Sequence, residues 1–203
     1  MTKPLITMFE AFGAGATAIG PRLAERLGVP WIGQVLSSGD MEAMDPKGTG
    51  RVDVSGFLRS LAFTDQGSVE LLESPYVSLA REQAVSVRDL VRDGGVILGR
   101  NATVILADRP AALHVKLEAS PAHRIARAAK EAGISTEQAA VRQRREDEAR
   151  AQISLDVWGW DPRLTGYYDL VVNVETFGED GTVEVILDAL ERKRARAAAA
   201  QPA

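Results

Sequence analysis

Short apolar runs recur along the chain and predict the strands of a buried sheet. The runs cover residues 5–9, 29–32, 96–98 and 168–173. Uninterrupted runs of this kind are typical of parallel strands that are covered on both faces. Residues 111–119 alternate instead, so their strand should turn one face toward the core and the other, with His114, Lys116 and Glu118, away from it.

The segments between these runs carry apolar residues at helical spacing. A four-residue spacing predicts a helix over 16–27 that ends at Gly28. Further helices are expected over 75–93, with Leu90 on its apolar side, and over 121–133, 135–158 and 181–194. Ser135 and Gln138 have the spacing of a capping box at the start of the third of these. Strands that alternate with helices predict an α/β fold with a parallel sheet between helical layers. Ligands of such folds bind at the carboxyl ends of the strands.

Composition narrows the class of protein without identifying a function. The 203 residues include 45% hydrophobic residues and no cysteine, which excludes disulfides and thiolate metal sites. No apolar run approaches the roughly 18 residues of a membrane span, and no signal peptide is evident, so we expect a cytoplasmic protein. A net charge of −4 argues against general binding to nucleic acids.

The glycine turn between the first strand and the first helix is the main candidate for a ligand site. Such a turn points backbone N–H groups and a helix N-terminus at a phosphate. Against the phosphate-loop pattern G-x-x-x-x-G-K-[ST], Gly15 matches the second glycine and Thr17 the residue that binds Mg²⁺. Ala16 stands in the lysine position and Glu10 in that of the first glycine. A tight turn without a ligand is the alternative.

Four stretches resemble the cytidylate kinase-like family, whose members are P-loop relatives of nucleoside-monophosphate kinases. They are FGAG at 12–15, VILGRNA at 96–102, HVKLEASP at 114–121 running to Arg127, and DEAR at 147–150 followed by YDLVVN at 168–173. The resemblance implies a P-loop kinase-like three-layer α/β/α domain over 1–195. It further implies an inserted acceptor-binding helical lobe at about 34–92, a lid at about 135–165, and a disordered tail over 196–203.

The resemblance also implies a reaction and a set of site residues. The γ-phosphoryl group of ATP would move to a nucleoside monophosphate, with CMP as the first candidate, or to another small acceptor. Arg100 and Arg124 would bind the acceptor. Arg144, Arg145 and Arg150 would neutralise the transition state, with Asp147 orienting one of them. The donor phosphates would lie on the backbone amides of Gly13, Ala14, Gly15, Ala16, Thr17 and Ala18, and Mg²⁺ on Thr17.

Several positions depart from the family pattern and keep alternatives open. Phe9-Glu10 replaces a polar–basic pair, Gly33-Gln34 lacks an aspartate, and Gln143 stands near the place of the first lid arginine. Glu10 would repel phosphates. A catalytically impaired nucleotide-binding or partner-binding protein that keeps the kinase fold is therefore the alternative, with residues 158–160 as its contact surface. A homo-oligomeric scaffold is a third.

The arginine-rich helix has an alternative interpretation of its own. Arg142 and Glu146, like Arg144 and Glu148, have the four-residue spacing of ion pairs on a helix. The segment could then be an ordinary solvated surface rather than a lid.

Overall fold

The sheet places its first strand at the centre. In the computed structural model, which describes residues 3–34, 84–99 and 101–200, five parallel strands lie in the order β2-β3-β1-β4-β5. The connection after β1 runs to β2 on one side of the sheet, and the connection after β3 crosses to β4 on the other side of β1. The loop after β1 therefore lies at a topological switch point, where α/β folds bind ligands. The strands are β1 (Leu5–Glu10), β2 (Trp31–Ile32), β3 (Gly95–Leu98), β4 (Leu113–Glu118) and β5 (Leu170–Asn173).

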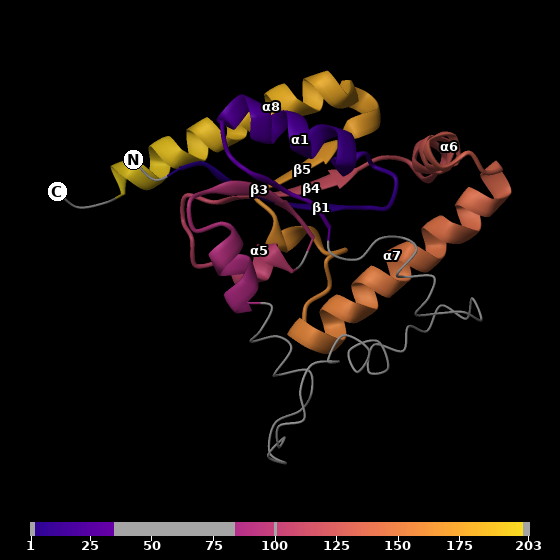
Figure 1. Cartoon of the computed structure of the whole chain (residues 1–203), viewed down its shortest axis with the longest axis horizontal. Coiled ribbons are helices and arrows are strands. Elements are labelled where there is room, and N and C mark those ends of the chain that lie inside the picture. Colours follow the sequence, from indigo (N-terminus) through magenta and orange to yellow (C-terminus); the bar gives the residue numbers. More distant parts are fainter. Residues whose placement is uncertain (1–2, 35–83, 100, 201–203) are drawn as a thin grey trace, which may run out of the picture.

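Helices cover both faces of this sheet (Figure 1). On one face lie α1 (Ala16–Leu27) and α8 (Val174–Ala199). On the other lie α5 (Ala102–Ile105) and the helical residues 84–90. Two more helices, α6 (Pro121–Ala132) and α7 (Thr136–Trp158), follow β4 beyond the carboxyl ends of the strands, and the short helix η1 (Thr165–Tyr167) precedes β5. The predicted three-layer α/β/α fold is confirmed.

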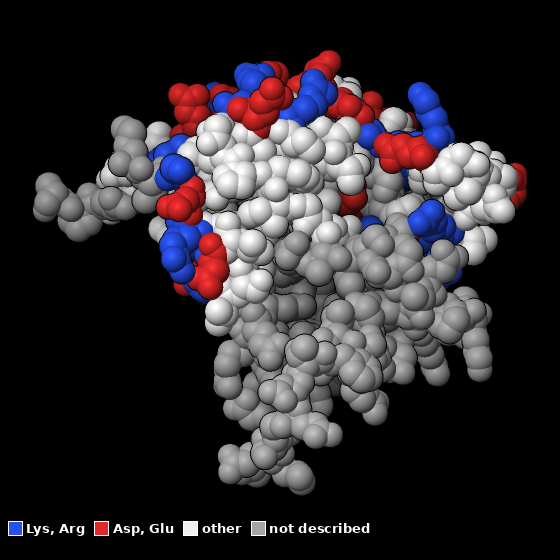
Figure 2. Space-filling view, in the orientation of Figure 1, with Lys and Arg blue, Asp and Glu red and all other residues white. Residues whose placement is uncertain are grey.

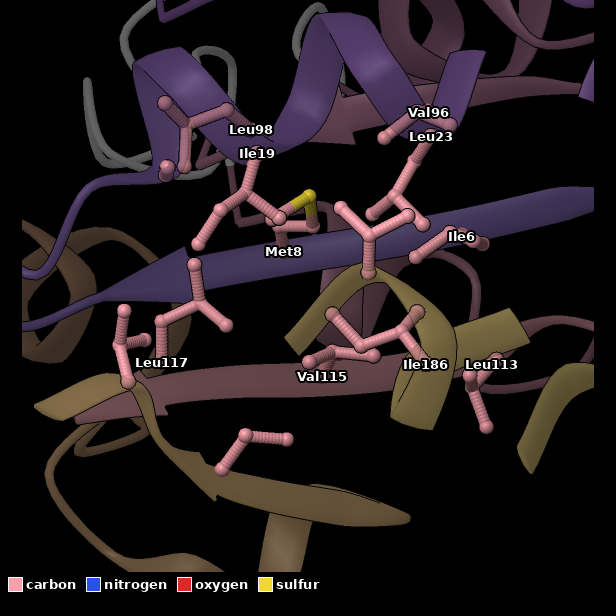
Figure 3. Packing of buried hydrophobic residues seen from close by; sticks show 14 of the residues in the cluster. Ile6, Met8, Ile19, Leu23, Val96, Leu98, Leu113, Val115, Leu117 and Ile186 are labelled. Carbon is pink, nitrogen blue, oxygen red and sulfur yellow. The ribbon is translucent and has the colours of Figure 1, made fainter. Parts of the chain in front are cut away.

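Two hydrophobic clusters, one on each face, hold the layers together. In the first, Ile19 and Leu23 of α1 point toward Ile6 and Met8 of β1, and Ile186 of α8 lies beside the β4 strand (Figure 3). The second cluster joins the opposite face of the sheet to α5 and residues 84–91. Since each fully buried aliphatic side chain contributes about 1.5–3 kcal/mol, the two clusters fix β1 from both sides.

Three local features differ from the sequence-based expectation. His114 and Lys116, expected on the outer face of their strand, are buried. Leu90 was expected to face inward with its neighbours on the 75–93 helix, yet it is 43% exposed. The last helix, predicted over 181–194, follows a non-helical kink at Gly178 that separates it from a short helical turn capped by Asn173, and its alanine-rich end, expected to be disordered, stays helical to Ala199. The capping box of Ser135 and Gln138 is confirmed.

Some expectations fall on residues outside the described part of the chain. They concern Arg100, most of the inserted lobe expected at about 34–92, and residues 201–203.

The described surface is mixed in charge. Figure 2 shows basic and acidic side chains interleaved over α1 and α8, where Arg26 pairs with Glu184 at 2.7 Å and Arg22 pairs with Asp180. None of the helices in residues 3–34, 84–99 and 101–200 has the length and hydropathy needed to cross a membrane. In the same residues, no three acidic or histidine side chains gather as a metal site.

Candidate functional site

The loop between β1 and α1 is shaped by two glycines with left-handed backbone angles. Gly13 has φ 84° and Gly15 has φ 100°, a region that residues with a Cβ atom rarely adopt. A Cβ atom on Gly13 would lie only 2.6 Å from the Arg124 carbonyl oxygen. The loop therefore passes so close to α6 that glycine is required at this position.

The side chain of Glu10 occupies the place where this loop would bind an anion. Its Oε2 atom accepts hydrogen bonds from the backbone amides of Gly15, at 3.0 Å, and Ala16, at 2.8 Å. We call these two amides the phosphate cradle. They open α1, whose dipole also favours a negative charge there.

Opposing effects act on the Glu10 carboxyl group. Its burial raises the pKa above the ordinary value of 4.5. The charge of Arg150, the two cradle hydrogen bonds and the charge of Arg127 each lower the pKa and so partly offset that effect. The carboxyl group therefore takes the place of a ligand anion at a real cost in desolvation.

Other amides predicted to hold phosphate already have partners. The Ala14 amide donates to the Ala11 carbonyl at 2.9 Å, and the Ala18 amide donates to the Gly15 carbonyl at 3.1 Å. Of the six predicted amides, Gly15 and Ala16 therefore hold the Glu10 carboxylate, while Ala14 and Ala18 bond to carbonyl groups of the loop itself. Thr17, the predicted Mg²⁺ residue, is exposed in the first turn of α1, next to the cradle.

A hydrogen-bonded cluster of four residues, one contributing its backbone and three their side chains, links α6 and α7 to this loop. Asp147 accepts from the Phe12 amide and from Arg124 Nη1, both at 2.8 Å. Arg124 Nη1 also reaches the Phe12 carbonyl at 3.0 Å, and Nε reaches the Ala119 carbonyl at 3.2 Å. Gln143, with its amide oxygen turned toward Arg124, accepts from Nη1 and Nη2. We call Phe12, Arg124, Gln143 and Asp147 the Phe12 clasp.

Two residues with predicted roles have their partners in this clasp. Asp147 was expected to orient an arginine of its own helix, but the structure pairs it with Arg124 of α6. Arg124, expected to hold the acceptor, directs its guanidinium donors at groups of the protein itself. It is fully engaged as a link between the loop and α7.

One face of α7 carries a buried row of charges toward Phe12. Glu146 is 0% exposed and pairs with Arg142 at 3.1 Å and with Arg150 at 2.7 Å. Both guanidinium groups lie over the Phe12 ring, at 6.0 and 5.3 Å from its centroid. The expected Arg142–Glu146 pair exists, and it is half-buried, since Glu146 is inaccessible while the Arg142 side chain is 26% exposed.

The three predicted lid arginines do not share this face. Arg150 lies on it and reaches Gln34 at 3.4 Å. Helical spacing places Arg144 on another side of α7, where it is exposed, and Arg145 at the edge of this face, three residues after Arg142. Arg150 is the one of the three for which a contact with the loop is described, over the Phe12 ring.

Arg127 is a neighbour of the loop that the site prediction left out. A Cβ atom on Gly15 would lie 2.7 Å from its guanidinium carbon, so this side chain lies directly against the cradle. Glu179 and Glu131 hold it there at 2.7 and 2.8 Å. Its position one helical turn after Arg124 was the available signal, since residues three apart lie on one side of a helix.

The far end of α7 is also anchored. Asn101 accepts hydrogen bonds from Ser154 at 2.8 Å and from the Trp160 indole at 3.0 Å. Trp160 is 4% exposed and stacks edge-on against Tyr167. It therefore belongs to the interior rather than to the contact surface that was considered for residues 158–160.

With this geometry established, comparison with known sequences identifies the family. The sequence model of the cytidylate kinase-like family matches residues 5–176. The chain belongs to the cytidylate kinase-like family. A cytidylate kinase from Methanopyrus kandleri is 27% identical over 198 residues, which cover 92% of this chain and 93% of that enzyme.

Another relative matches only in part. A uronate isomerase from Corynebacterium glutamicum is 31% identical over 115 residues, which are 57% of this chain. The match spans only about a fifth of that protein's length, 22%.

Solved structures agree with the family's kinase-like fold. An uncharacterized protein from Eubacterium ventriosum superimposes with a TM-score of 0.67 at 16% identity, over 93% of this chain and 98% of that one. A gluconokinase from Sinorhizobium meliloti gives 0.52 at 15% identity, over 96% and 95%. At these identities the likeness shows the fold.

As a cytidylate kinase-like site, the arrangement is suited to binding an anion. Two amides at the start of α1 hold one anionic oxygen, Arg127 lies against Gly15, and the charge of Arg150 acts on the same Glu10 carboxyl group. These donors match the charge and hydrogen-bonding capacity of a phosphate group.

Proposed function

We propose that this cytidylate kinase-like protein is a phosphotransferase that moves the γ-phosphoryl group of ATP to a nucleoside monophosphate, with CMP as the first candidate. The observation that carries the proposal is the pair of cradle amides, directed at an anionic group and flanked by Arg127 and Arg150. Phosphoryl transfer depends mainly on positioning and on positive charge around the equatorial oxygens. Both requirements are met by backbone donors and arginines.

The proposal gives each group a role. Gly15 and Ala16 would donate to the phosphates of ATP, and the Thr17 hydroxyl would help to hold Mg²⁺, which neutralises phosphate charge when bound. Arg150 would stabilise the charge that develops on the transferring group. Arg144 and Arg145 are proposed for the same task, and Arg100 for the acceptor. Arg124 is left out, because its donors hold the Phe12 clasp.

The names of two similar proteins point to a second class of phosphoryl acceptor. The chain matches part of a protein named uronate isomerase and shares the fold of a gluconokinase. Sugar acids are therefore the alternative small acceptors to nucleoside monophosphates.

The proposal is tested by single-turnover transfer from γ-labelled ATP to a panel of nucleoside monophosphates, gluconate and glucuronate. We expect labelled product with one class, and a loss of about a hundredfold or more in Arg150→Ala, the size typical of a lost transition-state donor. Arg92→Ala is the matched control, because Arg92 is exposed and pairs with Asp89 away from the loop. Failure of wild type and of Glu10→Ala to bind ATP would overturn the proposal.

The occupied cradle favours a second candidate function. With Glu10 on the cradle amides, the protein could bind nucleotide or a partner while transferring no phosphoryl group. ATP binding by calorimetry without turnover of any acceptor, in wild type and in Glu10→Ala, would support this candidate over the kinase.

A further inference from the structure

Glu10 binds the cradle in the way that a phosphate oxygen would. A single carboxylate oxygen accepts from two successive amides, at 3.0 and 2.8 Å, at the first turn of a twelve-residue helix. A phosphate group uses the same donors through the same kind of anionic oxygen. Both anions cannot use the two amides at once, because like charges at such short range repel strongly.

Arg150 supplies a second place for that carboxylate. Its side chain is 10% exposed, and its Nη2 atom pairs with Glu146. The Nε and Nη1 atoms are buried and have no hydrogen-bond partner within the described residues. Buried donors of a charged group normally have acceptors, so the site is short of one negative group. Arg150 is also close enough to Glu10 to lower the pKa of its carboxyl group.

The surroundings of Glu10 exclude other obvious destinations. Glu146 already pairs with Arg142 and Arg150, and Arg127 already pairs with Glu131 and Glu179. Arg124 and Asp147 pair with each other in the clasp. Arg127 and Arg150 both keep buried N–H groups without a hydrogen-bond acceptor among the described residues, Nε in Arg127 and Nε with Nη1 in Arg150. Arg127 has two carboxylate partners of its own, whereas Arg150 shares Glu146 with Arg142, so Arg150 is the neighbour that is short of negative charge.

We propose that Glu10 is a built-in competitor for the phosphate cradle, and that a polyphosphate displaces its carboxylate from the Gly15 and Ala16 amides onto the unused donors of Arg150. This inference rests on the proposed function, since it assigns a regulatory element to the same site. The exchange swaps one pair of hydrogen bonds for another and makes or breaks no covalent bond. Binding of the ligand and release of Glu10 are then one event.

The competitor lowers the apparent affinity of the site. When the competent state is a minor fraction of the protein, the apparent Kd rises by the inverse of that fraction. We therefore expect Glu10→Ala to bind inorganic pyrophosphate at least about tenfold more tightly than wild type. Glu10→Gln keeps an acceptor oxygen but not the charge, so it should lie between the two.

The test is isothermal titration of pyrophosphate, and of ATP in a parallel series, against wild type, Glu10→Ala and Glu10→Gln. Glu25→Ala is the matched control, because Glu25 is an exposed carboxylate on α1. Pyrophosphate reports on the cradle alone, whereas ATP also reports contacts with the nucleoside. Amide chemical shifts of Gly15 and Ala16 should change on ligand addition to wild type, and Glu10→Ala should shift the same two signals without ligand.

A double-mutant cycle tests the transfer to Arg150. If Arg150 receives the displaced carboxylate, Arg150→Ala should weaken pyrophosphate binding at least about threefold more in wild type than in Glu10→Ala. An equal loss in both backgrounds would overturn the transfer.

The outcomes separate this inference from the proposed function. Equal pyrophosphate affinity in wild type and Glu10→Ala refutes the competitor and leaves the kinase proposal standing. No binding of ATP or pyrophosphate by either protein overturns both. Glu10→Gln serves the same comparison if Glu10→Ala does not fold.

Discussion

At the scale of single residues, the space around the α-carbon of Gly13 determines which residue the loop tolerates at that position. Gly13 and Gly133 both have left-handed backbone angles, φ 84° and 63°. A Cβ atom on Gly133 would meet nothing within 4 Å, whereas one on Gly13 would collide with the Arg124 carbonyl. The two glycines therefore separate backbone strain from steric overlap.

We predict that Gly13→Ala destabilises the protein more than Gly133→Ala. Gly133→Ala should cost about 1–2 kcal/mol, the strain of a left-handed alanine. Gly13→Ala should add about 1–3 kcal/mol for forced overpacking. Urea unfolding followed by circular dichroism measures both, and equal losses would show that the loop can move away from α6.

At the scale of elements, α7 is the part whose role the packing revises. Its charged sequence suits either a lid or a solvated surface, but three of its charges form a buried row against Phe12. Asp147 accepts a hydrogen bond from the loop amide of Phe12 near the middle of α7, and Ser154 donates one to Asn101 near its end. In this structure α7 lies closed against the phosphate cradle's loop.

We predict that Asp147→Ala loosens the loop and α7 together. The change leaves the Phe12 amide and Arg124 without a shared acceptor, a loss of about 1.5–3 kcal/mol for hydrogen bonds to a charged group. Hydrogen exchange should speed up about tenfold or more at Phe12 and along the middle of α7. Asp156→Ala, an exposed change on the same helix, is the control and should leave both segments protected. Unchanged exchange at Phe12 in the Asp147 variant would contradict a role for the clasp.

At the scale of the whole molecule, stability depends on polar groups inside the sheet as well as on its two apolar clusters. His114 of β4 is buried, and its Nδ1 atom lies 2.8 Å from the Thr7 hydroxyl of β1, which lies 3.2 Å from that of Thr103. Burial lowers the pKa of His114 below 6.5, while the charge of Asp169 opposes this shift and that of Lys193 supports it. The folded protein therefore holds this imidazole neutral.

This pKa shift predicts that the molecule loses stability in acid. The unfolded chain binds a proton at His114 near pH 6.5, while the folded chain binds it only at lower pH. The free energy of unfolding should thus fall as the pH drops below 6.5, by about 1.4 kcal/mol for each unit of lowering. His114→Gln should flatten this slope in urea titrations between pH 7 and pH 4.5, and His123→Gln should not. Parallel slopes for all three proteins would refute the assignment.

The sequence by itself determined the order and type of the elements. The helix predicted over 16–27, the stop at Gly28 and the capping box at Ser135 all match the structure, because they depend on neighbours a few residues apart. The alternation along β4 correctly placed Leu113, Val115 and Leu117 in one cluster. The glycine loop between β1 and α1 could be located for the same reason, since its glycines follow a strand directly.

Only the tertiary structure decided how the site is occupied. Local spacing marks Glu10 as an unusual residue, but its hold on the cradle depends on a burial that the whole fold creates. The partners of Arg124 and Asp147 come from segments 23 to 135 residues apart. The buried His114 and Lys116 likewise have distant partners, since His114 lies against the Thr7 hydroxyl, 107 residues away, and Lys116 donates to the Arg163 carbonyl, 47 residues away. Contacts between such distant residues leave no periodic trace in a sequence, because they are set by how packed elements meet and not by the chain between them.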